Sequence, residues 1–142
     1  MVYGKWLTQE ADISACLELR ETVLGTGTDA TDRQSQHALI LSDGSPVATG
    51  RLYYDMGEFV IEYLCVLPPY RGQGYGDLLI RFMLLKAFSH GAPSVKAICN
   101  SPNTAFLGKY GFAACADGAW RVDEAHAMTR HCSSSSSAHP SV

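Results

Sequence analysis

The segment that most constrains the fold is a glycine-rich stretch, residues 71–76 (RGQGYG), which lies between a strand-like run and a helix-like run. The preceding residues 59–66 (FVIEYLCV) are almost wholly apolar, as is typical of a central strand covered on both faces. The following residues 77–90 carry apolar side chains at helical spacing. A buried strand, a glycine turn and a long helix in this order predict an α/β domain with a mixed sheet and a crossover helix.

The glycines of this segment indicate what it binds. Glycine at alternate positions lets the backbone turn sharply and leaves a run of amide groups with little side chain between them. The first turn of the following helix adds its own unpaired N–H groups and the positive end of its dipole. Together these groups predict a pocket for a diphosphate, to which Arg71 adds a charge-assisted contact.

The spacing of the glycines distinguishes between three known phosphate-binding motifs. A P-loop continues into a Gly-Lys pair, which residues 71–76 lack, and a dinucleotide fingerprint has G-x-G-x-x-G near the start of a βαβ unit. In contrast, residues 66–76 (VLPPYRGQGYG) closely resemble the acyl-coenzyme A loop of the GNAT superfamily of N-acyltransferases, whose pattern is V-x-P-x-x-R-G-x-G-x-[GA]. Asn100, twelve residues before Phe112, matches a second segment of that family. Residues 11–37 also resemble one subset of it, marked by Leu19, Arg20, Asp29, Asp32 and His37.

The resemblance implies a fold and a ligand. It implies a GNAT domain over residues 1–131, with a mixed sheet of six or seven strands and helices on both faces. Acetyl-coenzyme A would lie between two splayed parallel strands, residues 59–66 and 94–99, and the backbone N–H near Val66 would stabilise the oxyanion. The positions that the resemblance assigns to the cofactor are Cys65, Val66, Arg71, Gly72, Gln73, Gly74, Tyr75, Gly76, Asp77 and Asn100.

The implied reaction is direct transfer of the acetyl group to a primary amine of a small molecule or peptide. No enzyme nucleophile is needed, and no Ser or Cys constellation resembles a triad. The amine must lose a proton before it attacks. Glu62, the only acidic residue in its apolar strand, is the candidate base. The open alternative is that Glu62 faces solvent or pairs with an arginine such as Arg51.

The general acid for the departing thiolate is less clearly marked. Many family members have Tyr five residues before the Phe of the Gly-Phe turn, but that position is Leu107 here. Tyr110, one helical turn later, is the candidate, and packing is its alternative role. Because Leu107 departs from the pattern, a second function remains open. The chain would then be a catalytically weak acyl-coenzyme A sensor or interaction module.

Composition removes other function classes. The 142 residues carry a net charge of -3 and no basic stripe, so we expect no nucleic-acid partner. The longest apolar runs are far shorter than the roughly 20 residues that span a bilayer, so we expect no membrane span. With no secretory signal at its start, we expect a cytoplasmic protein. Dimers are frequent in the family that the chain resembles, so a homodimer is possible. Asp29 and Asp32, in a loop rich in Gly and Thr, would either attract a cationic amine or be merely solvated.

The five cysteines are widely spaced and contain no Cys-x-x-Cys pair, so we expect neither a metal site nor a disulfide framework. The serine-rich residues 132–142 predict a disordered tail. Elsewhere, periodicity predicts a helix between Asp12 and Leu24, and a loop at 25–36 with one short helical turn. A short helix is expected at 103–109. Strands are expected at 2–7, 37–41, 46–54, 94–99 and 126–129.

Overall fold

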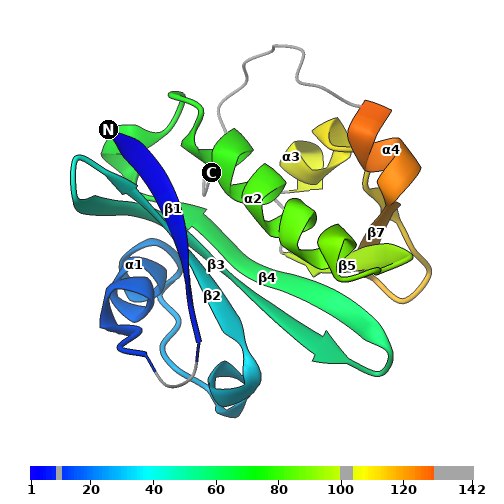
Figure 1. The fold of residues 1–142 in the computed structure, drawn as a ribbon, viewed down its shortest axis with the longest axis horizontal. Coiled ribbons are helices and arrows are strands. Elements are labelled where there is room, and N and C mark those ends of the chain that lie inside the picture. Colours follow the sequence, from blue (N-terminus) through cyan, green and yellow to red (C-terminus); the bar gives the residue numbers. More distant parts are fainter. Residues whose placement is uncertain (9–10, 100–103, 130–142) are drawn as a thin grey trace.

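The computed structural model describes residues 1–8, 11–99 and 104–129 of the chain. Its strands form a seven-stranded sheet in the order β1-β2-β3-β4-β5-β7-β6 (Figure 1). The strands are β1 (Val2–Leu7), β2 (Gln36–Ser42), β3 (Ser45–Asp55), β4 (Glu58–Val66), β5 (Ser94–Ile98), β6 (Ala113–Ala114) and β7 (Trp120–Asp123). Strands β4 and β5 are parallel, and every other neighbouring pair is antiparallel.

Helices cover both faces of this sheet. They are α1 (Ser14–Leu24), α2 (Tyr75–Ser89), α3 (Thr104–Lys109) and α4 (Glu124–Thr129), with 3-10 turns η1 (Ala30–Gln34) and η2 (Pro68–Tyr70). Helix α2 is the crossover between the parallel strands β4 and β5, and it lies across one face while α1 lies on the other (Figure 1). The expected mixed sheet of six or seven strands with helices on both faces is therefore confirmed.

Two apolar clusters hold the layers together. The larger one joins α2 and α3 to the sheet and includes Ile61, Leu79 and Met83, all fully buried. The smaller one lies beneath α1 and includes Cys16, Leu19, Leu39, Leu41 and Cys65. Because side chains alternate along a strand, β4 contributes to both clusters and is covered on both faces.

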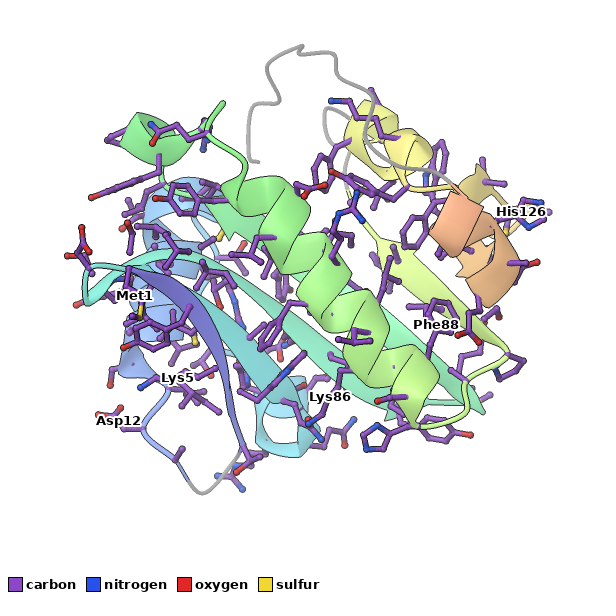
Figure 2. All side chains as sticks on the ribbon, turned by 45° about the horizontal axis from the view of Figure 1, so that its top comes forward. Met1, Lys5, Asp12, Lys86, Phe88 and His126 are labelled. Atoms are coloured by element: carbon purple, nitrogen blue, oxygen red, sulfur yellow. The ribbon has the colours of Figure 1, made fainter. Side chains whose placement is uncertain are left out.

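The centre of β3 allows α2 to come close to the sheet. A Cβ atom built on Gly50 would lie 2.8 Å from Sδ of Met83, so any larger residue here would force the Met83 side chain to move. Towards the edge of the sheet, Trp6 of β1 stacks on Phe82 of α2 with ring centroids 5.1 Å apart. Lys86, which Figure 2 places on α2 beside β1, holds its Nζ 5.2 Å from the Trp6 ring. These contacts fix α2, and with it the segment that precedes it.

Most of the expected elements are found within one or two residues of their expected bounds. The strand expected at 126–129 is wrong: these residues belong to α4, and the last strand is β7, Trp120–Asp123. The reason is local, because Oδ1 of Asp123 accepts the backbone N–H of His126 at 2.8 Å and so caps a helix there. The expected serine-rich tail and Asn100 lie outside the described residues. Within them, no helix is long and apolar enough to cross a membrane.

Candidate active site

The glycine-rich segment turns between β4 and α2 with its amides unpaired. Gly72 and Gly74 have φ values of +76° and +92°, a left-handed conformation that strongly favours glycine. Tyr70 and Arg71 donate their N–H groups back to Leu67 and Pro68, and pairing resumes only where Leu78 donates to Gly74. Among the described residues, no backbone carbonyl or side chain accepts from the six amides between, those of residues 72–77. These donors, with the N-terminal dipole of α2, are available to an anion, which is what the predicted diphosphate site requires.

Side chains of the same segment are occupied in holding its shape. Arg71 donates from Nε to the carbonyl of Val66 at 3.0 Å, and Gln73 from Nε2 to the carbonyl of Pro69 at 2.9 Å. The Tyr75 hydroxyl donates to Oγ of Ser42 in β2 at 2.9 Å. These side-chain bonds brace the main chain of the segment, and the predicted contact of Arg71 with the diphosphate stays a prediction.

Beside this segment, β4 extends beyond the end of its pairing with β5. Their last pairing in the described part of the chain is Glu62 with Ile98, although β4 continues to Val66. Leu67 donates to Val47 of the β3 side at 2.9 Å, and in an antiparallel ladder such bonded positions alternate. The N–H of Val66, one residue earlier, therefore points away from β3, towards the edge along which β4 pairs with β5 earlier in the strand. This is the backbone donor expected near the reacting carbonyl.

A bulge interrupts β4 directly after its last pair with β5. Between the pairs Arg51–Glu62 and Thr49–Cys65, β3 advances two residues and β4 advances three. The extra residue is Tyr63, whose φ of +59° lies in the left-handed region. As a result Glu62 and Tyr63 both face the α1 side of the sheet, where their side chains contact Arg51 and Arg20.

The Cys65 thiol lies on that same side, within the apolar cluster beneath α1. It is fully buried, and burial raises its pKa to about 12, so it is neither a nucleophile nor a polar ligand. Only its main chain is available to a ligand. Among the described residues, no three His, Cys, Asp or Glu side chains are grouped to hold a metal ion.

Tyr110 lies on the other side of the sheet and packs in the main core. It is 5% exposed, and its ring centroid is 5.1 Å from that of Phe106. Its hydroxyl donates to Oδ1 of Asp77 in the first turn of α2 at 2.7 Å. Leu107, at the position where the family pattern has Tyr, is fully buried. The hydroxyl that a general acid needs is thus already donating to a carboxylate, which supports the packing role.

Glu62 is paired with Arg51, the alternative that the sequence left open. Oε1 accepts from Nη2 of Arg51 at 2.6 Å and from the Tyr53 hydroxyl at 3.2 Å, and the side chain keeps 16% of its surface exposed. Among the described residues, nothing donates to Oε2. Burial and the neighbouring carboxylate raise the pKa of Tyr53 to about 12, so it stays a hydrogen-bond donor.

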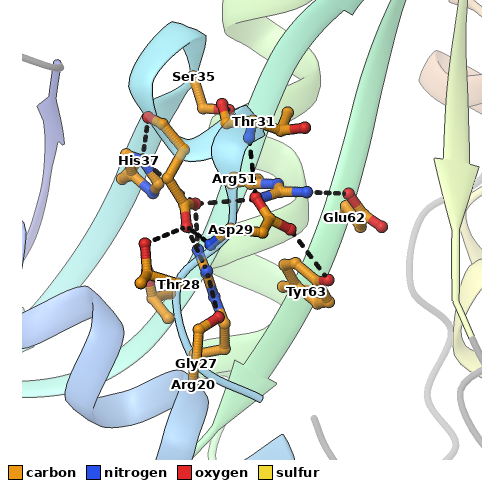
Figure 3. A network of polar contacts seen from close by, with 12 residues as sticks. Arg20, Gly27, Thr28, Asp29, Thr31, Ser35, His37, Arg51, Glu62 and Tyr63 are labelled. Carbon is orange, nitrogen blue, oxygen red and sulfur yellow. Dashed lines mark hydrogen bonds and ion pairs between the residues drawn. The ribbon is translucent and has the colours of Figure 1, made fainter.

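Behind Glu62 lies a buried network of charges that joins α1, η1, β3 and β4 (Figure 3). Asp32 is at its centre: it accepts from both Nη atoms of Arg20 at 3.0 Å and from Nη1 of Arg51 at 2.9 Å. Oδ2 of Asp32 also accepts from the Thr28 hydroxyl and the Asp29 amide. Burial acts to raise the pKa of Asp32, but these donors outweigh it and hold the pKa well below its usual range.

The outer end of this network is accessible. Asp29 binds Nη1 of Arg51 at 2.6 Å, yet 39% of its side chain is exposed, and the Tyr63 hydroxyl donates to its Oδ2 at 3.4 Å. Two guanidinium groups, Arg20 and Arg51, face three carboxylates, Asp29, Asp32 and Glu62, which leaves one unit of negative charge. The accessible end of the network is thus acidic.

Part of this arrangement was not evident from the sequence. The sequence suggests Arg51 only as a partner for Glu62, whereas it binds three carboxylates from two segments, η1 with its N-cap and β4. Tyr53 was not considered a partner of Glu62. The available signal was strand alternation, which places residues 49, 51 and 53 of β3 on one face. Asn100 is outside the described residues, so its assigned role stays a prediction.

Comparisons with known proteins identify the family and the fold. Residues 6–112 match the model of the Acetyltransferase (GNAT) family. The Uncharacterized protein YyaT of Bacillus subtilis (strain 168) is 27% identical over 119 residues, covering 76% of this chain and 80% of YyaT.

Solved structures show the same fold. Escherichia coli ElaA superposes with a TM-score of 0.75 at 22% identity, covering 87% of this chain and all of that one. The PaiA N-acetyltransferase of Thermoplasma acidophilum, solved in complex with coenzyme A, gives 0.67 at 14% identity, covering 87% and 99%. The family model covers three quarters of the chain, and the mixed sheet is that of the GNAT fold. The chain belongs to the acetyltransferase (GNAT) family.

Proposed function

We propose that this protein transfers an acetyl group from acetyl-coenzyme A directly to a primary amine of a small molecule or peptide. The observation that carries the proposal is the run of unpaired amides at residues 72–77, set beside the open edge of β4 where the Val66 N–H points outward. The proposed anion site and the proposed oxyanion donor thus both belong to the main chain of residues 66–77.

The segment fits the diphosphate of coenzyme A. A Cβ built on Gly72 or Gly74 meets nothing within 4 Å, so the space in front of both residues is open. The amides of residues 72–77 would hold the diphosphate, and the Val66 N–H would face the thioester carbonyl. When bound, acetyl-coenzyme A supplies an activated acetyl group, so the chain needs no nucleophile of its own.

The backbone donor stabilises charge that develops during transfer. As the amine attacks, negative charge grows on the carbonyl oxygen, and a fixed N–H at that point is worth roughly 3 kcal/mol in the transition state. The ladder with β3 fixes the Val66 N–H, because Leu67 is hydrogen-bonded to Val47 and Val66 itself is fully buried. No reorganisation of the chain is then required at the moment of reaction.

Glu62 is the proposed base. An amine with a pKa of about 10 arrives as ammonium at neutral pH and must release a proton before its lone pair attacks. Oε1 of Glu62 is held by Arg51 and Tyr53, and Oε2 is left to accept that proton. The acidic end of the network, with Asp29 exposed beside Glu62, supports a positively charged acceptor.

One observation favours a second function, an acyl-coenzyme A sensor. Leu107 replaces the tyrosine of the family pattern, and the hydroxyl of Tyr110 is bound to Asp77. A chain that binds the cofactor but lacks a side chain to protonate the thiolate would turn over slowly. The two functions differ in one measurable product, free coenzyme A thiol.

The test incubates the protein with acetyl-coenzyme A and a panel of amines: polyamines, aminoglycosides, basic peptides and a neutral alcohol as blank. The proposed function requires release of free thiol that depends on the amine, with an acetylated amine detected by mass spectrometry. A rise in melting temperature with acetyl-coenzyme A, and no thiol release with any amine, would instead support the sensor.

A further inference from the structure

Arg20 and Asp32 form the deepest part of the charge network, and the proposed reaction gives them no direct part. Arg20 is 1% exposed and Asp32 is 4% exposed, so neither meets the acceptor. Burying two such ions costs several kcal/mol each before their attraction offsets it, and an apolar pair often serves stability as well. A role beyond stability is therefore worth seeking.

A continuous chain of contacts leads from Arg20 to the candidate base. Arg20 grips Asp32 with two parallel hydrogen bonds of 3.0 Å, and Oδ1 of Asp32 binds Nη1 of Arg51 at 2.9 Å. The same guanidinium then binds Oε1 of Glu62 through Nη2 at 2.6 Å. The three links join α1, η1, β3 and β4 (Figure 3).

The planes of the two guanidinium groups are also fixed. The central carbons of Arg20 and Arg51 each lie 4.6 Å from the centre of the Tyr63 ring. Tyr63 itself is held by the β4 bulge and by its bond to Asp29. Arg51 therefore has little freedom to present Nη2 in another direction.

We propose that Arg20 is a positioning residue for the acetyl transfer: acting through Asp32 and Arg51, it keeps Oε1 of Glu62 occupied and Oε2 available for the proton of the amine. This inference rests on the proposed function of Glu62. It gives Arg20 and Asp32 of the 11–37 segment one joint role, which is to orient the base through Arg51.

Removing Arg20 should change how tightly Glu62 binds a proton, and the direction of the change can be predicted. Asp32 would lose two donors and would attract Arg51 more strongly, which weakens the bond from Arg51 to Glu62. Three carboxylates would then share one guanidinium in place of two. Both effects make Glu62 bind a proton more tightly, so the acid limb of the pH–rate profile moves to higher pH.

The experiment compares R20M and R20K with the intact protein and with R121M. Arg121 is a matched control because it also grips a carboxylate with two bonds, to Glu58 at 2.7 and 2.9 Å, outside the network. Two quantities are measured: kcat/KM for the acetylated amine against pH, and the titration of the Glu62 carboxyl carbon by 13C NMR. The second needs no turnover.

In R20M the acid limb and the carboxyl titration should both move up by about one pH unit, with a smaller shift in R20K, which keeps the charge. KM for acetyl-coenzyme A should stay within about twofold, because the anion site is untouched. R121M should leave both titrations in place. If R20M does not fold, R20K decides the question by the same two measurements.

A lowered melting temperature in R20M or R20K with both titrations unmoved would reduce Arg20 to a structural residue and overturn the proposal. The proposed function fails separately: if the intact protein acetylates no amine, the function is wrong. The NMR titration then still decides whether Arg20 controls Glu62.

Discussion

The two halves of the candidate site handle charge in opposite ways. The segment of residues 72–77, exposed at residues 72–74, offers partial positive charge through main-chain amides that no described group accepts from. The network behind Glu62 is made of side chains that are buried at Arg20, Asp32 and Arg51 and accessible at Asp29, and its full charges sum to one negative unit. Anion binding by the segment depends on the lack of side chains at Gly72 and Gly74. The charge balance of the network depends on each of its side chains.

This difference teaches where each half is vulnerable. A substitution in the glycine segment should damage ligand binding and leave the core packing intact, because the space in front of its glycines is open. A substitution in the network leaves an uncompensated buried charge and should damage folding first. The predictions below test that division, and a result that reverses it would show that the two halves are not separate.

The largest expected effect is on stability. Arg51→Met removes the only described guanidinium that binds Asp29 and Glu62, and it also deprives Asp32 of a donor. We expect the free energy of unfolding to fall by about 3–5 kcal/mol, as for the loss of one partner of a buried ion pair. Urea denaturation followed by circular dichroism measures it.

Arg121→Met is the control for this variant, since Arg121 binds two carboxylates at the surface. It should cost far less stability, because solvent screens exposed pairs. Equal losses in the two variants would contradict the view that the network is desolvated.

The second prediction concerns coenzyme A binding. In Gly74→Asp a carboxylate would occupy the space in front of the unpaired amides and repel the diphosphate, so we expect affinity for coenzyme A to fall at least about 100-fold, or about 2.7 kcal/mol. Isothermal titration calorimetry measures it. Gly57→Asp is the control, because Gly57 has a similar φ of +84° and equally open space but precedes β4 at the end remote from the segment.

Both variants place an L residue at a left-handed position, so they share the backbone strain. Normal binding in Gly57→Asp and lost binding in Gly74→Asp would assign the loss to the site. If Gly74→Asp still bound coenzyme A normally, the anion would have to lie elsewhere.

The third prediction asks whether the network acts on chemistry. Glu62→Gln keeps the shape of the side chain but removes its ability to accept a proton, so we expect kcat to fall by about 10²-fold near neutral pH. The loss should shrink at acidic pH, where a carboxylate base would already be protonated. Glu58→Gln is the control, since Glu58 is on the same strand and paired with Arg121. A pH profile unchanged by Glu62→Gln would remove Glu62 from the mechanism.

The contrast between the halves also explains what the sequence could predict. Glycine spacing, a preceding strand and a following helix are adjacent in the chain, so the segment 71–76 and the crossover helix could be predicted from the residues, and the family resemblance implied a mixed sheet of six or seven strands. The bulge of β4 could not be predicted, because one extra residue in a strand leaves its apolar pattern unchanged. That single residue brings Glu62 and Tyr63 to the same face.

The network depends on pairing between distant segments. The sequence drew attention to Arg20, Asp29, Asp32 and His37 but could not say which charges meet, because their partners come from α1, η1, β2 and β3. The last strand failed for a related reason. At 126–129 the alternation suggested a strand, but the carboxylate of Asp123 just before it caps a helix.

The smallest expected effect is the pH dependence of stability that His37 confers. This side chain is fully buried, and its Nε2 lies 3.3 Å from the carbonyl of Asp32. Burial lowers its pKa, and Arg20 and Arg51 act in the same direction, while Asp32 opposes them. In the unfolded chain a histidine takes up a proton near pH 6.5. Below that pH the unfolded state therefore binds one more proton than the folded state.

The free energy of unfolding should thus fall as pH drops below about 6.5, by at most about 1.4 kcal/mol per pH unit, until His37 titrates in the folded state as well. In His37→Gln this slope should disappear, whereas in His90→Gln, which alters an exposed histidine, it should persist. Urea midpoints at pH 7.5, 6.5, 6 and 5.5 measure both slopes. Coenzyme A affinity should show no such dependence on His37, because the glycine segment binds through amides that do not titrate. A loss of affinity in His37→Gln parallel to the change in stability would mean that the two halves are coupled through β2.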